Sequence, residues 1–268
     1  MISTTIFTQE AQETHNTKIL ELLDEAIALA NLIKPDKDTR TLTQLYSEAF
    51  YSITEASEFY QDNLLNPTKY DLDKLKEFPT SLFNTLDSLA VIEVYGNLTT
   101  TSITTVIKET INKVLLDYFF LYPATDKYKM DKGSSYLSFL YQPEELDNQA
   151  NISDRLQQVT SITSVLYNTF DDSNLYPLFV EAFNAPRYLT TRFNGIKDKE
   201  INGWGYKGTP KETIIDFLDD IDNITKAMLV IEKYDTTAAT VVKVSRGLLD
   251  IARSNTVFEF SKYLEEDK

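Results

Sequence analysis

Apolar residues recur three and four positions apart along most of this 268-residue chain. In the clearest series the steps are four, three, four and three, through Phe217, Ile221, Ile224, Met228 and Ile231. This spacing places the side chains on one face of an α-helix, which must then pack against another element. The pattern recurs from Ile19 to the C-terminal region, so the sequence predicts an all-α fold. We expect an irregular multi-helix bundle of about eight to ten helices.

The rare residue types support a helical fold. The chain has only 7 glycines, too few for the tight turns of an all-β protein, and no cysteine. Disulfides, thiolate nucleophiles and zinc sites with sulfur ligands are therefore excluded. A chain of this length buries roughly three-quarters of its unfolded surface, so it has enough core to fold without such links.

The sequence suggests a simple domain organisation. Residues 1–8 are polar and rich in threonine, and we expect a flexible arm followed by a single helical domain over 9–268. The run from Val91 to Tyr95 recurs 139 positions later, from Val230 to Tyr234, and a Leu-Leu-Asp run ends at both Asp117 and Asp250. Two interpretations stay open: tandem halves at 9–134 and 135–268, or chance likeness between amphipathic helices.

The net charge of −15 is spread evenly. Residues 1–134 contain 20 acidic and 12 basic residues, and residues 135–268 contain 21 and 14, giving −8 and −7. Such a surface repels phosphate groups, so we expect no direct nucleic-acid binding. The longest apolar stretch, 114–122, includes Asp117 and is far shorter than the roughly 20 residues of a membrane helix. We therefore expect no membrane association and a cytoplasmic protein.

The sequence offers little for catalysis or metal binding by histidine. The only histidine, His15, precedes the first apolar series, and we expect it to be an exposed residue at a helix start. One histidine is too few for the paired Glu-x-x-His ligands of a di-iron bundle. We expect no cofactor and no catalytic residue of this kind.

Carboxylates are the remaining candidates for catalysis. Asp216, Asp219 and Asp220 are spaced so that they share one helix face, which makes them the metal candidates of this sequence. The alternative is a solvated acidic face near a helix N-terminus, where negative charge is favoured by the helix dipole. We favour the solvated face.

The segment 187–211 differs from the rest of the chain. It has six basic and two acidic residues, and four of the seven glycines lie between 187 and 208, so we expect an irregular loop. Its cationic and aromatic residues belong to the types enriched at protein interfaces. The predicted partner-binding residues are Arg187, Arg192, Phe193, Lys197, Trp204, Tyr206 and Lys207. Alternatively, the cations pair with the acidic helix that follows, and the aromatic rings fill the core.

A second candidate surface is the stretch 118–141, which contains eight aromatic residues. One helix cannot bury so many rings, so they fill the space between helices or face another subunit. We expect most of them in the core.

These observations predict a non-enzymatic structural or protein-interaction protein: a scaffold, an assembly subunit or an adaptor. Its partner would be another protein, including a second copy of itself. One alternative is an acidic inhibitor or immunity-type protein that blocks a basic nucleic-acid-binding partner. Another is a magnesium-dependent helical hydrolase that uses the carboxylates.

Overall fold

The computed structural model describes residues 9–33, 40–65, 77–122, 148–169, 176–205, 208–235 and 238–265. Every regular element in these ranges is a helix and none is a strand, which confirms the all-α prediction. The predicted arm at 1–8 lies outside the described residues. The chain divides into two compact units, Met1–Glu144 and Glu145–Lys268, and each is described by itself.

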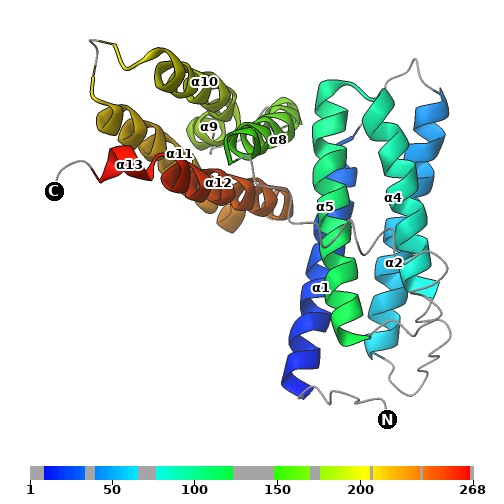
Figure 1. The fold of residues 1–268 in the computed structure, drawn as a ribbon. Helices are drawn as coiled ribbons and strands as arrows, with labels where there is room; N and C mark the ends of the chain where they lie inside the picture. The colour runs from blue at the N-terminus through cyan, green and yellow to red at the C-terminus, as the bar shows by residue number, and fades with distance from the viewer. Residues whose placement is uncertain are drawn as a thin grey trace. The chain divides into compact units, whose positions relative to one another are not determined.

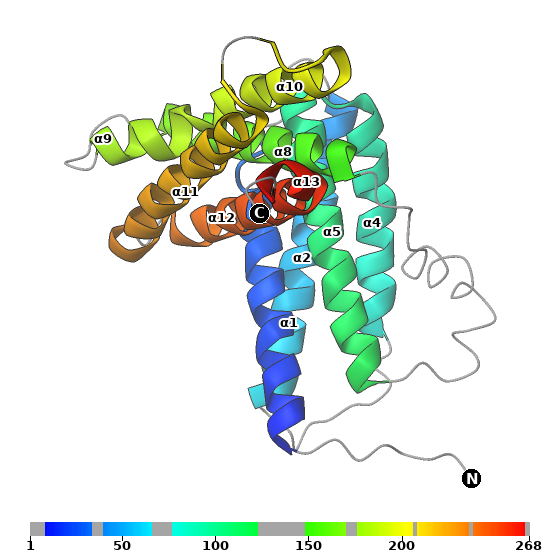
Figure 2. The ribbon, with the colours of Figure 1, turned by 60° about the vertical axis from the view of Figure 1, so that its left-hand side comes forward.

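The first unit is a four-helix bundle. It consists of α1 (Gln9–Ala30), α2 (Arg40–Leu65), α4 (Glu77–Tyr95) and α5 (Leu98–Leu121). The helix α1 packs against α2 and α5, and α4 packs against the same two helices, so the four close into a ring (Figures 1 and 2). Successive long helices alternate in direction (Figure 1), as in an up-and-down bundle.

Apolar residues spaced three and four positions apart form the core of this bundle. Ile19, Leu23, Leu29, Leu82 and Leu89 are at most 1% exposed. The threonine-rich start of α5 is helical because the Asn97 side chain caps it, accepting a hydrogen bond from the backbone N–H of Thr100 at 2.9 Å.

The second unit contains α8 (Asn148–Thr169), α9 (Tyr176–Phe179), the π-helical turn Val180–Asn184, α10 (Pro186–Asn202), α11 (Pro210–Tyr234), α12 (Ala239–Glu259) and α13 (Ser261–Leu264). Its four long helices also form a ring, because α8 packs against α12 and α10, and α11 packs against the same two. A capping box begins α11: Thr209 Oγ1 accepts from the Glu212 N–H at 3.2 Å, and the Thr209 N–H donates to Glu212 Oε2 at 3.0 Å.

The expectation of an irregular loop over 187–208 is wrong for most of that segment. Residues 186–202 form α10, and a short connection follows from Gly203 to Thr209. Leu189, Phe193 and Ile196 lie at helical spacing and are at most 2% exposed. A glycine costs about 1 kcal/mol in a helix, whereas burying one large apolar side chain contributes about 1.5–3 kcal/mol. The glycine-based prediction failed because this burial outweighs the cost of Gly195.

The third long helices of the two units, α4 and α11, correspond at the offset of 139 found in the sequence. Buried residues pair at this offset as Phe78 with Phe217, Leu82 with Ile221, Leu89 with Met228 and Ile92 with Ile231. Each helix also forms an ion pair with the helix that follows it: Glu93 with Lys108, and Glu232 with Arg246. The duplication of the two halves stays a prediction. The corresponding buried residues and ion pairs are the structural features that agree with it.

The Glu93–Lys108 pair joins α4 to α5. Lys108 Nζ lies 2.5 Å from Glu93 Oε2, and Thr105 Oγ1 donates to Glu93 Oε1 at 2.6 Å. Burial by itself raises the pKa of Glu93, but the hydrogen bonds from Lys108 and Thr105 and the charge of Lys108 outweigh it. The pKa of Glu93 is therefore lowered.

Replacing Phe193 with alanine should destabilise the second unit by about 3–5 kcal/mol, because it opens a cavity in a core that cannot fully collapse. The matched control is Tyr188→Ala on the same helix, where the ring is 53% exposed and the expected change is within about 0.5 kcal/mol. Urea unfolding followed by circular dichroism measures both. Equal effects of the two substitutions would contradict the burial of Phe193.

Because the folded pKa of Glu93 lies below its unfolded value, the ion pair stabilises the folded state above the unfolded pKa. This contribution is lost as the pH falls through the folded pKa. Glu93→Gln should therefore lower stability at pH 7 and flatten the decline in stability between about pH 5 and pH 3. Unfolding at a series of pH values tests this. Glu55→Gln, an exposed carboxylate on α2, controls for the loss of one negative charge.

Candidate functional site

The predicted partner-binding residues now have defined positions on the second unit. Arg187 and Tyr188 lie at the exposed start of α10, where the Arg187 guanidinium carbon is 4.6 Å from the centre of the Tyr188 ring. Lys197 is half-buried on the same helix. Tyr206 and Lys207 lie outside the described residues.

Two of the predicted residues have internal roles. Arg192 forms an ion pair with Asp220 of α11. Phe193 is fully buried. The centre of its ring lies 6.0 Å from that of Phe217 and 6.4 Å from that of Phe260. Phe193 is therefore a core residue and not a surface contact. The sequence missed this because the residue was assigned to a loop, where its place in the apolar stripe of α10 is not visible.

Trp204 is the centre of an aromatic and cationic group on the surface. Gly203 ends α10 with a φ of +88°, a conformation that glycine adopts without strain. The Trp204 ring packs on Tyr263 of α13, with the two ring centres 5.4 Å apart. Lys199 Nζ lies 5.7 Å from the centre of the Trp204 ring. We call this group the Trp204 corner; it comprises Lys199, Glu200, Ile201, Trp204, Lys262 and Tyr263.

An ion pair holds α13 against the end of α10 in this corner. Lys262 Nζ lies 3.0 Å from Glu200 Oε1 and 4.7 Å from the centre of the Tyr263 ring. The hydrogen bond to Glu200 raises the pKa of Lys262, with a further contribution from Tyr263. The C-terminal helix therefore contributes directly to the shape of this surface.

One polar atom in the corner is unsatisfied. The Trp204 Nε1 is enclosed and has no hydrogen-bond acceptor among the described residues. An enclosed donor without a partner costs about 1–3 kcal/mol. Since Trp204 lies between Gly203 and Gly205, the backbone on either side is conformationally permissive.

The aspartates proposed as metal candidates do not form a cluster. Asp216 and Asp219 are exposed on α11, and Asp220 pairs with Arg192. In the same helix Asp222 accepts hydrogen bonds from Arg253 at 2.6 and 3.2 Å, and these hydrogen bonds raise the pKa of Arg253. Within the described ranges, no three histidine or carboxylate side chains gather as metal ligands would.

The expectation that His15 is exposed at a helix start is wrong. His15 is half-buried within α1, with its Nδ1 2.9 Å from Oδ1 of Asp117 on α5. Lys18 Nζ donates to the same carboxylate at 2.8 and 3.2 Å, and Asp117 itself is only 7% exposed. An ionised carboxylate only accepts hydrogen bonds, so the Nδ1 of His15 carries the proton that it donates.

A signal for this cluster was present in the sequence. Asp117 interrupts the apolar stretch 114–122, and a carboxylate in such a position requires a hydrogen-bonding or cationic partner. The sequence could not show which residue supplies it, because His15 and Lys18 precede Asp117 by 102 and 99 positions.

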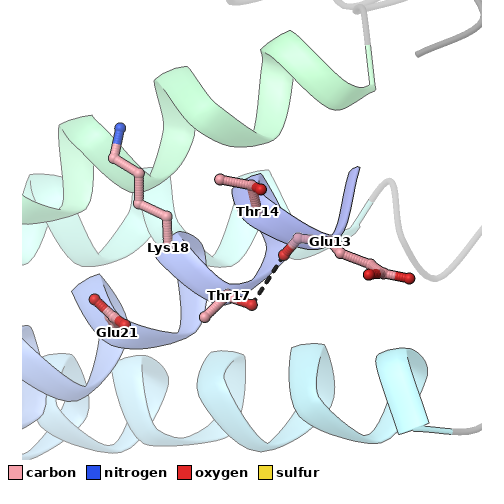
Figure 3. Close-up of a pocket in the computed structure, with 5 residues that line it drawn as sticks. All are labelled: Glu13, Thr14, Thr17, Lys18 and Glu21. Atoms are coloured by element: carbon pink, nitrogen blue, oxygen red, sulfur yellow. Dashed lines mark hydrogen bonds between the residues drawn. The ribbon is translucent and has the colours of Figure 1, made fainter. Parts of the chain in front are cut away.

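A hollow of about 460 Å³ lies beside this cluster on the outer side of α1. Figure 3 shows its lining, which consists of Glu13, Thr14, Thr17, Lys18 and Glu21. All five side chains are exposed, and Thr17 Oγ1 donates to the Glu13 carbonyl at 2.9 Å. The lining belongs to a single helix face, which is the form of a surface depression and not of an enclosed ligand site.

The aromatic stretch that begins at residue 118 divides between core and surface. Tyr118 is 4% exposed and lies 5.0 Å from Phe78 and 6.5 Å from Tyr60, measured between ring centres. Phe120 is 48% exposed and lies 4.5 Å from the His15 ring. The part from 123 to 141 lies outside the described residues.

No protein-family model, characterised protein or solved structure shows a significant match to the chain. None of the described helices contains a stretch that is both long and apolar enough to cross a membrane.

Replacing Asp117 with alanine should destabilise the first unit by about 1–3 kcal/mol, because it leaves the half-buried His15 donor without its acceptor. Lys18 can turn to solvent, since its side chain is 56% exposed, and this limits the cost. Thermal unfolding measures the change. The control is Asp250→Ala, the exposed aspartate of the second Leu-Leu-Asp run, with an expected change within about 0.5 kcal/mol. A loss at Asp250 as large as that at Asp117 would contradict this role.

Proposed function

We propose that this chain is a non-enzymatic structural or protein-interaction protein, an assembly subunit or scaffold, that contacts another protein through the Trp204 corner. The observation that carries the proposal is Trp204 itself. Its ring is half-buried at the surface, and its enclosed N–H has no acceptor among the described residues. Tryptophan is among the residues most enriched at the energetic centres of protein interfaces.

The surroundings of Trp204 support this role. Ile201, the residue before the last of α10, is 70% exposed, and Lys199 and Lys262 lie over the two rings of the corner. An apolar centre bordered by charged groups is the usual composition of a protein contact surface.

The corner differs in form from the loop expected from the sequence. Its cations and its exposed isoleucine are carried by helices, and a short connection places only the tryptophan and the flanking glycines. A surface built on helices is ordered before it binds, so less conformational entropy is lost on association.

Trp204→Ala should weaken association at least about tenfold, because truncating an aromatic residue at the energetic centre of an interface costs about 2 kcal/mol or more, and about 1.4 kcal/mol corresponds to a factor of ten. Trp204→Phe keeps a ring against Tyr263 and removes the N–H donor, so it separates the contribution of the ring from that of the donor. Sedimentation velocity of the purified chain and quantitative co-purification of its partner measure both variants.

The matched control is Tyr51→Ala on α2, where an aromatic ring that is 64% exposed lies in the other unit. We expect this substitution to leave association unchanged. A chain that is strictly monomeric, and whose co-purifying proteins are the same with and without Trp204, would contradict the proposed function.

A further inference from the structure

The C-terminal helix α13 packs on Trp204 without contributing a residue to the core. It is a single turn, Ser261–Leu264, that lies beside α11 and α12, and none of its residues is buried. Its backbone hydrogen bonding is local, since the Tyr263 N–H donates to the Phe260 carbonyl at 3.0 Å. The turn can therefore move as a unit with this hydrogen bond intact.

Phe260, the residue before α13, is the fixed end of this turn. Its side chain is fully buried, and the centre of its ring lies 6.4 Å from that of Phe193 in the core. Its N–H donates to the Thr256 carbonyl of α12 at 3.0 Å. Motion of α13 therefore pivots at Phe260, because the buried ring stays in place while the side chains that follow it swing.

Beyond this anchor, two side chains hold α13 against the end of α10. Lys262 Nζ lies 3.0 Å from Glu200 Oε1, and the ring centres of Tyr263 and Trp204 are 5.4 Å apart. The Lys262 side chain is 62% exposed, so water and salt weaken this ion pair. An exposed ion pair and one aromatic contact are weaker links than the burial of a complete phenylalanine ring.

The closed position of α13 is opposed by a cost at Trp204. The indole Nε1 is enclosed and has no acceptor among the residues that the structure describes. Such a donor has lost its hydrogen bond to water, so Trp204 keeps this position only while the surrounding contacts outweigh the loss. Gly203 and Gly205 flank the indole, and their backbone freedom allows it to turn once a contact is released.

We propose that α13 is a C-terminal strap that regulates the Trp204 corner. The closed strap holds the Trp204 ring against Tyr263, and release of the strap frees the indole ring and its N–H for the partner, whose surface replaces Tyr263. The apparent affinity for the partner is then the intrinsic affinity multiplied by the open fraction. This inference rests on the proposed function and adds the regulation of that same site.

The chain has one tryptophan, so its tryptophan fluorescence reports on this corner alone. Quenching by acrylamide, a neutral probe, measures access to the indole in the purified full chain. Lys262→Ala and Tyr263→Ala each remove one of the two links that hold the strap. Each substitution should raise the quenching constant at least about twofold and shift the emission to longer wavelength, because both quantities follow the open fraction.

Salt gives a second measurement on the parent chain. Raising the salt concentration from about 0.05 M to about 1 M shortens the screening length and weakens an exposed ion pair such as Lys262–Glu200. Quenching of the parent chain should therefore increase with salt, and this increase should be lost in Lys262→Ala. Acrylamide has no charge, so salt does not screen its approach to the indole.

The matched controls are Lys233→Ala and Tyr234→Ala at the end of α11, outside the Trp204 corner. There a lysine likewise precedes a tyrosine, with Lys233 Nζ 5.5 Å from the centre of the Tyr234 ring, and both residues are exposed. These variants make the same changes of charge and ring in the same unit. They should leave the quenching and its salt dependence as in the parent chain, and circular dichroism confirms that every variant is folded.

The direction of the effect on association separates a strap from a fixed part of the contact surface. In the assays that test Trp204→Ala, both strap variants should tighten association at least about twofold. Weaker association in either variant means that α13 belongs to the contact; this overturns the strap while the proposed function stands. Unchanged quenching in both variants also overturns it. If quenching rises as expected but neither the parent nor the variants associate, the proposed function fails and the regulatory role fails with it.

Discussion

The burial of one apolar stripe on each long helix is the constraint on which the rest of this structure depends. A helix with such a stripe cannot cover it alone, and in each unit four long helices close into a ring in which every stripe faces inward. The third helix of each ring shows this most clearly, since Phe78 and Phe217 occupy corresponding buried positions on α4 and α11. Local capping by Asn97 and Thr209 sets the starts of α5 and α11.

Charged groups add specificity to packing that is otherwise not directional. The Glu93–Lys108 and Glu232–Arg246 pairs join the third helix of each unit to the fourth, and Asp222 and Arg253 make a further such contact. The carboxylate of Asp117 joins α5 to α1 through His15 and Lys18. Partly buried pairs of this kind add little net stability but penalise alternative pairings of the helices, because a misplaced partner leaves a charge unpaired.

At two surfaces the same physical rules are not satisfied within the chain. The Trp204 corner contains an enclosed N–H without an acceptor in the described part of the structure, and α4 leaves Val94 and Tyr95 largely exposed. Exposed apolar side chains of this kind are removed from water when a partner covers them, and this favours association.

The sequence by itself determined the helical class, the buried stripes and the capping box at Thr209, because these depend on residues at most a few positions apart. The sequence also indicated Trp204 as a candidate contact residue. The glycine and the charged residues of α10 led to the prediction of a loop, and that prediction missed the apolar stripe through Phe193. Only the tertiary structure decided that Arg192 pairs with Asp220, that Phe193 lies in the core and that His15 meets Asp117. Each of these depends on which helices become neighbours, and that is decided by the packing of whole stripes, which no local pattern in the sequence specifies.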